Sequence, residues 1–388
     1  MEIAGIIIGI IGLASGLYFG IRSLRSKAAP ELKRDIEKIK TQLEQVSIYL
    51  DGLPETKDKK KKALFEKGMS LMAGYKYEEA TDLFRECLTL ESDASEKSAL
   101  LNLMGNCFYA RSKWDSALGS LKQALEAAEE AKDEKGQAAA LGNLGVVYQA
   151  KGEWDKAIEF YNRGLKGSEK IGDEHGMVQT FNNLGTGYQL KGEWDKAIQF
   201  YNRALKGLEK IGDEHGMVQT FNNLGTVYQL KGECDKAIEF YNKVLKGLEK
   251  IGDVEDPLMK HVMAQTFNNL GTVYQLKGEW DKAVEFHNKA LKGFEKIGEE
   301  HGMARTYGNM GNVYRLKGEW DKTIGFYNRA LKGLEKIGDE HGMAQTYVNL
   351  GAVYHLKAEW VKAIEFYNKA LKGLEKIGDE HGTAKSFY

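Results

Sequence analysis

The feature that most constrains this chain is an aromatic position that returns with a period of forty residues. The series runs Trp114, Trp154, Trp194, Cys234, Trp280, Trp320 and Trp360, and Tyr77 marks a degenerate first copy. One step is longer because six extra residues lie near 254–259, where the recurring IGDEHGM becomes IGDVEDPLMKHVM. A fixed period of this size is typical of a solenoid, in which similar units stack and each contacts mainly its neighbours.

Each forty-residue unit carries two helical patterns, which residues 177–211 illustrate. Apolar residues at helical spacing predict a first helix: Met177, Phe181, Leu184 and Tyr188. Gly192 ends this helix, and a second, longer apolar stripe runs from Trp194 to Ile211. We expect Gly185 to lie where the two helices cross closely. Neither helix can bury its stripe alone, so the stacking of hairpins predicts one continuous core.

A glycine also recurs inside the second helix of each unit. The series is Gly167, Gly207, Gly247, Gly293, Gly333 and Gly373. Each glycine destabilises a helix by about 1 kcal/mol relative to alanine, so its recurrence needs a reason. We expect close packing against the next repeat, and a hinge that lets the solenoid flex is the alternative.

The combined pattern F..LG..Y...G.W..A...Y..AL resembles the tetratricopeptide (TPR) repeat. In the fourth copy its residues are Phe181, Leu184, Gly185, Tyr188, Gly192, Trp194, Ala197, Tyr201, Ala204 and Leu205. The usual TPR unit has 34 residues and a proline that ends the second helix, whereas this unit lacks the proline and lengthens that helix. The forty-residue form is similar to the TPRs of LGN-type polarity adaptors, kinesin light chains and prokaryotic multi-TPR proteins. The resemblance implies an all-α, right-handed superhelical solenoid of about eight helix-turn-helix repeats over 63–388.

The polar side of the first helix repeats uncharged amides, most visibly in the recurring FNNLGT. The resemblance places this side in a concave groove, as three rows. The first row is Asn143, Asn183, Asn223, Asn269, Asn309 and Asn349. The second is Gln189, Gln229, Gln275 and Arg315, with Gln149 before it and His355 after it. The third is Gln179, Gln219, Gln265, Arg305 and Gln345.

A row of amides is suited to holding a peptide main chain, because an amide offers both a hydrogen-bond donor and an acceptor. Such rows can bind an extended segment whatever its side chains, and LGN-type adaptors have asparagine-lined grooves of this kind. TPR domains that bind chaperone tails use Lys and Arg instead, and only Arg305 and Arg315 are basic in these rows. The alternative is that the amides bond to neighbouring helices and contact no ligand.

Residues 3–21 form an apolar run without a charged side chain, IAGIIIGIIGLASGLYFGI. A helix of this length spans roughly 28 Å, close to the thickness of the bilayer core. A secretory signal peptide is the alternative, but basic residues would then precede the run. Here Arg22, Arg25 and Lys27 follow it, which predicts a single-pass anchor over 1–22 with its N-terminus outside and the repeats in the cytoplasm.

Two further segments separate this run from the repeats. In residues 23–51, apolar positions alternate in steps of four and three: Leu32, Ile36, Ile39, Leu43, Val46 and Leu50. This stripe predicts either a short coiled coil that forms a homodimer through 31–50 or an amphipathic helix that packs on the repeats. Residues 52–62, with Gly52, Pro54 and a lysine run, predict a solvated basic linker rather than a lipid-binding segment.

Nothing in the sequence predicts catalysis, a metal centre or a cofactor. His175, His215, His301, His341 and His381 recur in one turn, D/E-E-H-G, which indicates a turn residue rather than a cluster of ligands. Cys87 and Cys107 fall at core positions and Cys234 replaces a tryptophan. The net charge of −1 gives no reason to expect a nucleic-acid partner.

These observations together predict a membrane-anchored TPR scaffold or receptor that is not an enzyme. It would bind an extended segment of a partner protein in its concave groove. The alternative is a sensor whose superhelix changes compaction when it binds a peptide.

Overall fold

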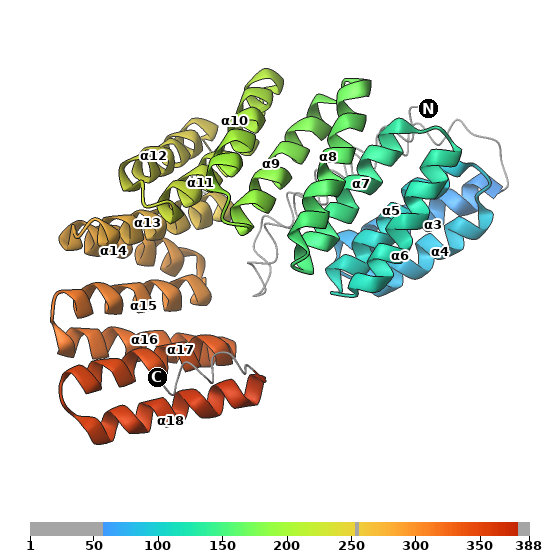
Figure 1. Cartoon of the computed structure of the whole chain (residues 1–388). Coiled ribbons are helices and arrows are strands. Elements are labelled where there is room, and N and C mark those ends of the chain that lie inside the picture. Colours follow the sequence, from blue (N-terminus) through green and yellow to red (C-terminus); the bar gives the residue numbers. More distant parts are fainter. Residues whose placement is uncertain (1–56, 253–255, 379–388) are drawn as a thin grey trace. The chain divides into compact units, whose positions relative to one another are not determined.

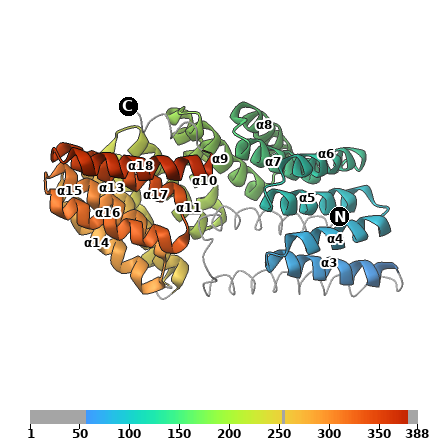
Figure 2. The same cartoon turned by 90° about the horizontal axis from the view of Figure 1, so that it is seen from below.

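The computed structural model describes residues 57–252 and 256–378, and within them every regular element is an α-helix (Figure 1). The helices alternate as first and second members of eight hairpins. Figures 1 and 2 both show the two helices of a hairpin side by side, as in α3 with α4 and α17 with α18. The chain divides into two compact units, residues 1–223 and 224–388.

The helix bounds follow the predicted period. The first helices are α3 (Lys57–Ala73), α5 (Ala94–Ala110), α7 (Glu134–Ala150), α9 (Glu174–Leu190), α11 (Glu214–Leu230), α13 (Pro257–Leu276), α15 (Glu300–Leu316) and α17 (Glu340–Leu356). The second helices are α4 (Tyr77–Leu90), α6 (Trp114–Glu130), α8 (Trp154–Ile171), α10 (Trp194–Ile211), α12 (Cys234–Ile251), α14 (Trp280–Ile297), α16 (Trp320–Ile337) and α18 (Trp360–Ile377). The insertion near 254–259 lengthens α13 to 20 residues, where α11 has 17.

The recurring IGDEHG ends one helix and begins the next. Gly172 adopts a left-handed φ of 68°, which only glycine adopts at little energetic cost, and it ends α8. The carboxylate of Asp173 then accepts a hydrogen bond from the Gly176 N–H at 3.0 Å, which caps α9. His175 lies in the exposed first turn of α9, so this recurrent histidine is a helix residue rather than the loop residue the sequence suggested.

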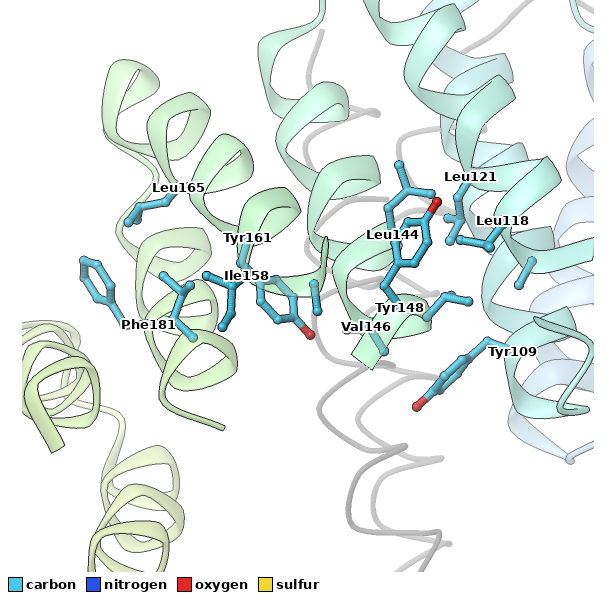
Figure 3. Close-up of a cluster of buried hydrophobic side chains, with 14 of the residues drawn as sticks. Tyr109, Leu118, Leu121, Leu144, Val146, Tyr148, Ile158, Tyr161, Leu165 and Phe181 are labelled. Atoms are coloured by element: carbon cyan, nitrogen blue, oxygen red, sulfur yellow. The ribbon is translucent and has the colours of Figure 1, made fainter. Parts of the chain in front are cut away.

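The core of each hairpin forms where the first helix crosses the second. In the cluster of Figure 3, Leu144 of α7 and Tyr161 of α8 are fully buried, and Phe181 of the next hairpin packs against the same cluster. The predicted close crossing at Gly185 is confirmed. A Cβ added there would lie 2.6 Å from Cε1 of Tyr201, too close for any side chain.

The glycines inside the second helices also permit close packing, but not against the next repeat. A Cβ on Gly207 of α10 would lie 2.3 Å from Cγ2 of Val178, which belongs to the first helix of the same hairpin. Gly333 of α16 approaches Ala304 of α15 in the same way, at 3.0 Å. The prediction that these glycines pack against the next repeat was therefore wrong. The two helices of one hairpin approach each other twice, once at each glycine.

Ion pairs connect successive hairpins along the surface. The lysine that follows α7, α9, α13, α15 or α17 reaches an aspartate at the start of the preceding second helix. Lys191 Nζ lies 2.6 Å from Asp155 Oδ1, and Lys317 Nζ lies 2.7 Å from Asp281 Oδ1. Exposed pairs of this kind contribute at most about 1 kcal/mol each. Their recurrence helps to set the register of stacking.

The first hairpin begins earlier than the sequence indicated. Helix α3 starts at Lys57, so residues 57–62 of the expected linker are helical. Lys61 explains the difference, because its Nζ lies 2.6 Å from Glu91 Oε2 and 2.7 Å from Glu96 Oε2. Burial alone would lower the pKa of Lys61, but these hydrogen bonds raise it above the usual value. Part of the lysine run thus serves to dock α3 on the next hairpin.

Several predicted features lie outside the described residues. They are the apolar run 3–21, the stripe over 31–50 with its proposed homodimer, and the recurrent histidine His381. Among the helices that the structure describes, none is both long enough and apolar enough to cross a bilayer.

Candidate functional site

The predicted rows lie on one side of the first helices, which we call the amide face. It is defined by the asparagine row and by the glutamine row, six residues further along each helix. The hydrogen bonds of these side chains divide the asparagines into two groups.

Asn143 and Asn309 are bonded to the preceding repeat. Asn143 is buried and its Nδ2 donates to Asn102 Oδ1 at 3.2 Å. Asn309 Nδ2 donates to Asn268 Oδ1 at the same distance of 3.2 Å, again across 41 residues of sequence. The acceptor in each case is the first asparagine position of the preceding first helix. For these two residues, the interpretation that the amides connect neighbouring helices is confirmed.

Asn183 and Asn349 belong to the second group. Both are half-buried and neither forms a hydrogen bond with another residue that the structure describes. The position that accepts from Asn143 and Asn309 is occupied here by glycine, Gly142 before Asn183 and Gly308 before Asn349. Asn223 and Asn269 are also half-buried and without such a bond in this part of the chain.

Asn223 forms no such bond although the corresponding position of the preceding repeat is asparagine. Asn182 Oδ1 accepts a hydrogen bond from the Thr220 hydroxyl at 3.1 Å instead. Asn222 likewise precedes Asn269. An asparagine in the preceding repeat therefore does not by itself hold the second asparagine.

The glutamine row is bonded within its own hairpin. Tyr201 OH donates to Gln189 Oε1 at 3.2 Å, and Tyr241 OH donates to Gln229 Oε1 at 3.1 Å. Burial raises the pKa of both tyrosines to about 12, so each hydroxyl stays protonated and acts as a donor. The carbonyl oxygen of these glutamines is thereby engaged, which leaves the amide nitrogen as the group available to a ligand.

The remaining predicted residues show no common pattern. Gln219 and Arg305 are exposed, while Gln179, Gln265, Gln275 and Arg315 are half-buried. The hairpin of Gln275 lacks the tyrosine partner, because His287 occupies that position. In the hairpin of Arg315, the hydroxyl of Tyr327 donates to Asn312 Oδ1 at 2.7 Å. Within the described residues, no group of three or more His, Cys, Asp or Glu side chains could hold a metal ion.

A row of exposed leucines ends the first helices, and the sequence reasoning missed it. The exposed fractions are 44% for Leu190, 51% for Leu230, 58% for Leu276, 43% for Leu316 and 57% for Leu356. Each leucine follows the second asparagine of its helix by seven residues, two helical turns, so both lie on one stripe. The sequence does show a change at this position. It is alanine in the first three copies, at residues 73, 110 and 150, and leucine in the five that follow.

Two of the three cysteines lie in the core. Cys87 and Cys107 are fully buried, as predicted for core positions, and burial raises their pKa values to about 11 and about 12. Their thiols therefore stay protonated at neutral pH and are poor nucleophiles. Cys234 is half-buried at the start of α12.

A family model described as "Tetratricopeptide repeat" matches residues 96–170, 176–250, 262–336 and 302–376. Together these matches cover well over half of the chain. No curated protein sequence gives a match.

Solved structures share the fold at low sequence identity. The apo form of the quorum sensor NprR from B. thuringiensis is 16% identical, with a TM-score of 0.66 over 89% of this chain and 96% of that one. A signal transduction ATPase with numerous domains and a tetratricopeptide repeat sensor, PH0952 from Pyrococcus horikoshii, is also 16% identical, with a TM-score of 0.63 over 94% of this chain and 56% of that one. BtubC (BKLC) from P. vanneervenii is 23% identical, with a TM-score of 0.51 over 59% and 93%.

Proposed function

This chain belongs to the tetratricopeptide repeat family, and we propose that it is a scaffold or receptor that holds an extended segment of a partner protein on its amide face. A solenoid of this family is suited to protein–protein interaction, because its stacked first helices present the same position many times. The single observation that carries the proposal is the set of half-buried asparagines with no hydrogen bond among the described residues.

The exposed leucines support the same proposal. They lie on the same stripe as the asparagines and offer apolar contact beside polar amides. A ligand bound there would combine main-chain hydrogen bonds with burial of apolar side chains, which is the usual division between orientation and affinity at a binding surface. Several repeats acting on one chain would add avidity.

The proposal predicts that three asparagines matter together. In a cross-linking pull-down with the full chain, the triple variant Asn183→Ala, Asn223→Ala, Asn269→Ala is expected to lose most captured partners, at about 0.5–1.5 kcal/mol for each hydrogen bond removed. A matched control, Lys206→Ala, Lys246→Ala, Lys292→Ala, changes exposed side chains on second helices and is expected to retain them. Circular dichroism confirms that both variants are folded. Undiminished capture by the folded asparagine variant would sink the proposal.

The proposal includes an anchor. Residues 3–21 are long and apolar enough to span a bilayer, and the basic residues after them favour a cytoplasmic position for the repeats. A protease-protection or reporter assay with a tag after residue 30 is expected to place the tag in the cytoplasm. A tag found on the outer side, or a chain that washes off membranes at high salt, would contradict this part.

A peptide-responsive sensor stays the alternative prediction. Two of the similar structures are described as sensors or as containing one, but identity of 16% shows a shared fold alone. Small-angle scattering separates the two roles, since a sensor is expected to become more compact when ligand binds and a scaffold to change little.

A further inference from the structure

The second helices from α6 onward have aspartate as their second residue, and α18 is the exception. The aspartates are Asp115, Asp155, Asp195, Asp235, Asp281 and Asp321. Five of them lie 2.6–3.3 Å from the lysine that follows the next first helix. In α18 the same position is Val361. The side chain that forms the ion pair between hairpins is therefore replaced by an apolar one.

Val361 belongs to an apolar patch on α18, which we call the end face and which consists of Trp360, Val361 and Ile364. Ile364 lies four residues after Trp360 and three after Val361, spacings at which helical side chains are neighbours. The exposed fractions are 55% for Trp360, 83% for Val361 and 61% for Ile364.

The corresponding isoleucine of α8 shows what normally covers this position. Ile158 is only 8% exposed, and a Cβ on Gly187 of the next first helix, α9, would lie 3.2 Å from its Cγ1. No helix that the structure describes follows α18, which ends the stack of α15, α16 and α17 in Figure 1. The end face is therefore uncovered in the described part of the chain.

A second departure from the repeat lies two residues before the end face. Ala358 occupies the turn position that is glycine in the five preceding hairpins, at residues 152, 192, 232, 278 and 318. It keeps a left-handed φ of 58°, which is strained for alanine, and it is exposed. Both departures replace the recurring residue by a more apolar one at an exposed position.

The cations beside the end face already have carboxylate partners. Lys357 Nζ lies 3.3 Å from Asp321 Oδ1 and 3.3 Å from Glu359 Oε1, and Lys362 Nζ lies 2.7 Å from Glu359 Oε2. The end face thus contains no charge that a partner must complement. A further hairpin of the same kind would bring its lysine to position 361, where valine offers no acceptor. An apolar partner without such a lysine fits better.

We propose that the end face is a contact between two copies of this chain, in which α18 of one copy packs against α18 of the other. A second end face supplies apolar side chains and brings no unpaired cation. Pairing of one patch with itself about a two-fold axis is the commonest symmetry of protein oligomers. Terminal repeats of soluble solenoids usually have a polar outer face, so an apolar one favours a covered surface. This contact is independent of the amide face and of the stripe over 31–50.

The test is sedimentation velocity of the full chain in dodecyl maltoside, from about 1 to 100 µM, because a patch of three side chains supports only a weak dimer. Val361→Asp restores the residue that six other second helices carry, so it is expected to fold. Ile364→Lys is a second variant at an exposed side chain.

Two controls accompany these variants. Gly325→Glu in α16 also restores an acidic residue that other copies carry, at an exposed position where an added Cβ meets nothing within 4 Å. Ile39→Lys interrupts the stripe over 31–50, which is the other predicted site of self-association. Circular dichroism confirms that every variant is folded.

We expect the wild type, Gly325→Glu and Ile39→Lys to form dimers with dissociation constants within about twofold of one another. Val361→Asp and Ile364→Lys are expected to weaken the dimer at least about tenfold, because each would bury two unpaired charges in a two-fold contact. A wild-type chain that stays monomeric over this range would overturn the proposal, and would mean that residues 379–388 or another protein cover the end face. A dimer that persists in both end-face variants would overturn it as well, and its loss in Ile39→Lys would assign self-association to 31–50.

Discussion

Gly145→Ala is expected to destabilise the folded chain by about 2–3 kcal/mol, whereas Gly142→Ala, three residues earlier in α7, is expected to stabilise it by about 0.5–1 kcal/mol. The two substitutions are chemically identical and lie within one turn of one helix. They differ only in what the added methyl group meets, so the pair isolates packing from helix propensity.

The methyl group at Gly145 has no free volume. It would lie 2.5 Å from Cε1 and 2.6 Å from Cδ1 of Tyr161, whose side chain is fully buried. The ring cannot move aside easily, because its hydroxyl donates to Gln149 Oε1 at 3.2 Å. At Gly142 the methyl group meets nothing within 4 Å, so the intrinsic preference of helices for alanine decides the sign.

Denaturation followed by circular dichroism at 222 nm measures both changes. Solenoids can unfold in steps, so the shift of the first transition midpoint is the appropriate quantity. A double variant, Gly145→Ala with Tyr161→Leu, serves as the control, since the smaller side chain relieves the clash. If both Gly142→Ala and Gly145→Ala shift the midpoint in the same direction, the close approach at Gly145 does not limit stability.

The elements that sequence predicted well are those that depend on local spacing. The hairpins follow from apolar residues at helical intervals, and the crossing at Gly185 follows from a small residue that recurs opposite Tyr201. The end of the first helix follows from a recurring glycine, Gly192 in the fourth copy, which adopts a left-handed φ of 74°. Each of these signals is complete within one repeat, so a single copy is enough to interpret it.

The elements that sequence reasoning missed depend on partners in another repeat. Asn143 donates to Asn102 of the preceding repeat, whereas Asn183 has Gly142 at the corresponding position and forms no such bond. The asparagine row therefore looks uniform in sequence although its hydrogen bonds differ from repeat to repeat. Lys61 looked like part of a solvated charge run because Glu91 and Glu96, its partners, lie 30 and 35 residues away. Only the packed structure brings such pairs together. Ligand contact at any of these asparagines stays a prediction.

The wild-type chain is expected to lose stability as the pH falls below neutral because of His287, and the variant His287→Tyr is expected to lack this loss. His287 is fully buried in α14, at the position that Tyr161, Tyr201 and Tyr327 occupy in other hairpins. His287 Nδ1 lies 3.0 Å from Asn268 Oδ1, and because an amide oxygen can only accept, Nδ1 carries the proton and donates. Asn268 Oδ1 also accepts from Asn309 Nδ2. The other ring nitrogen, Nε2, is buried with no hydrogen-bond partner among the described residues.

Burial lowers the pKa of His287 from 6.5 to about 4. The unfolded chain therefore binds more protons than the folded chain between these two values, and stability rises with pH across that window. The contribution of neutral His287 is complete above pH 6.5 and is lost as the pH falls toward 4, by a total of about 3 kcal/mol. Protonation would place a charge on Nε2 where no group described in the structure can pair with it.

The measurement is the free energy of unfolding at several pH values from 4 to 8, for the wild type and for His287→Tyr. We expect the two chains to differ by about 3 kcal/mol more at pH 4 than at pH 7, because tyrosine does not titrate in this range. His301→Tyr, which changes an exposed histidine in α15, controls for the substitution itself and is expected to keep the wild-type slope. Parallel curves for wild type and His287→Tyr would show that His287 does not contribute to acid sensitivity, and that its buried Nε2 is satisfied by a group such as an ordered water molecule.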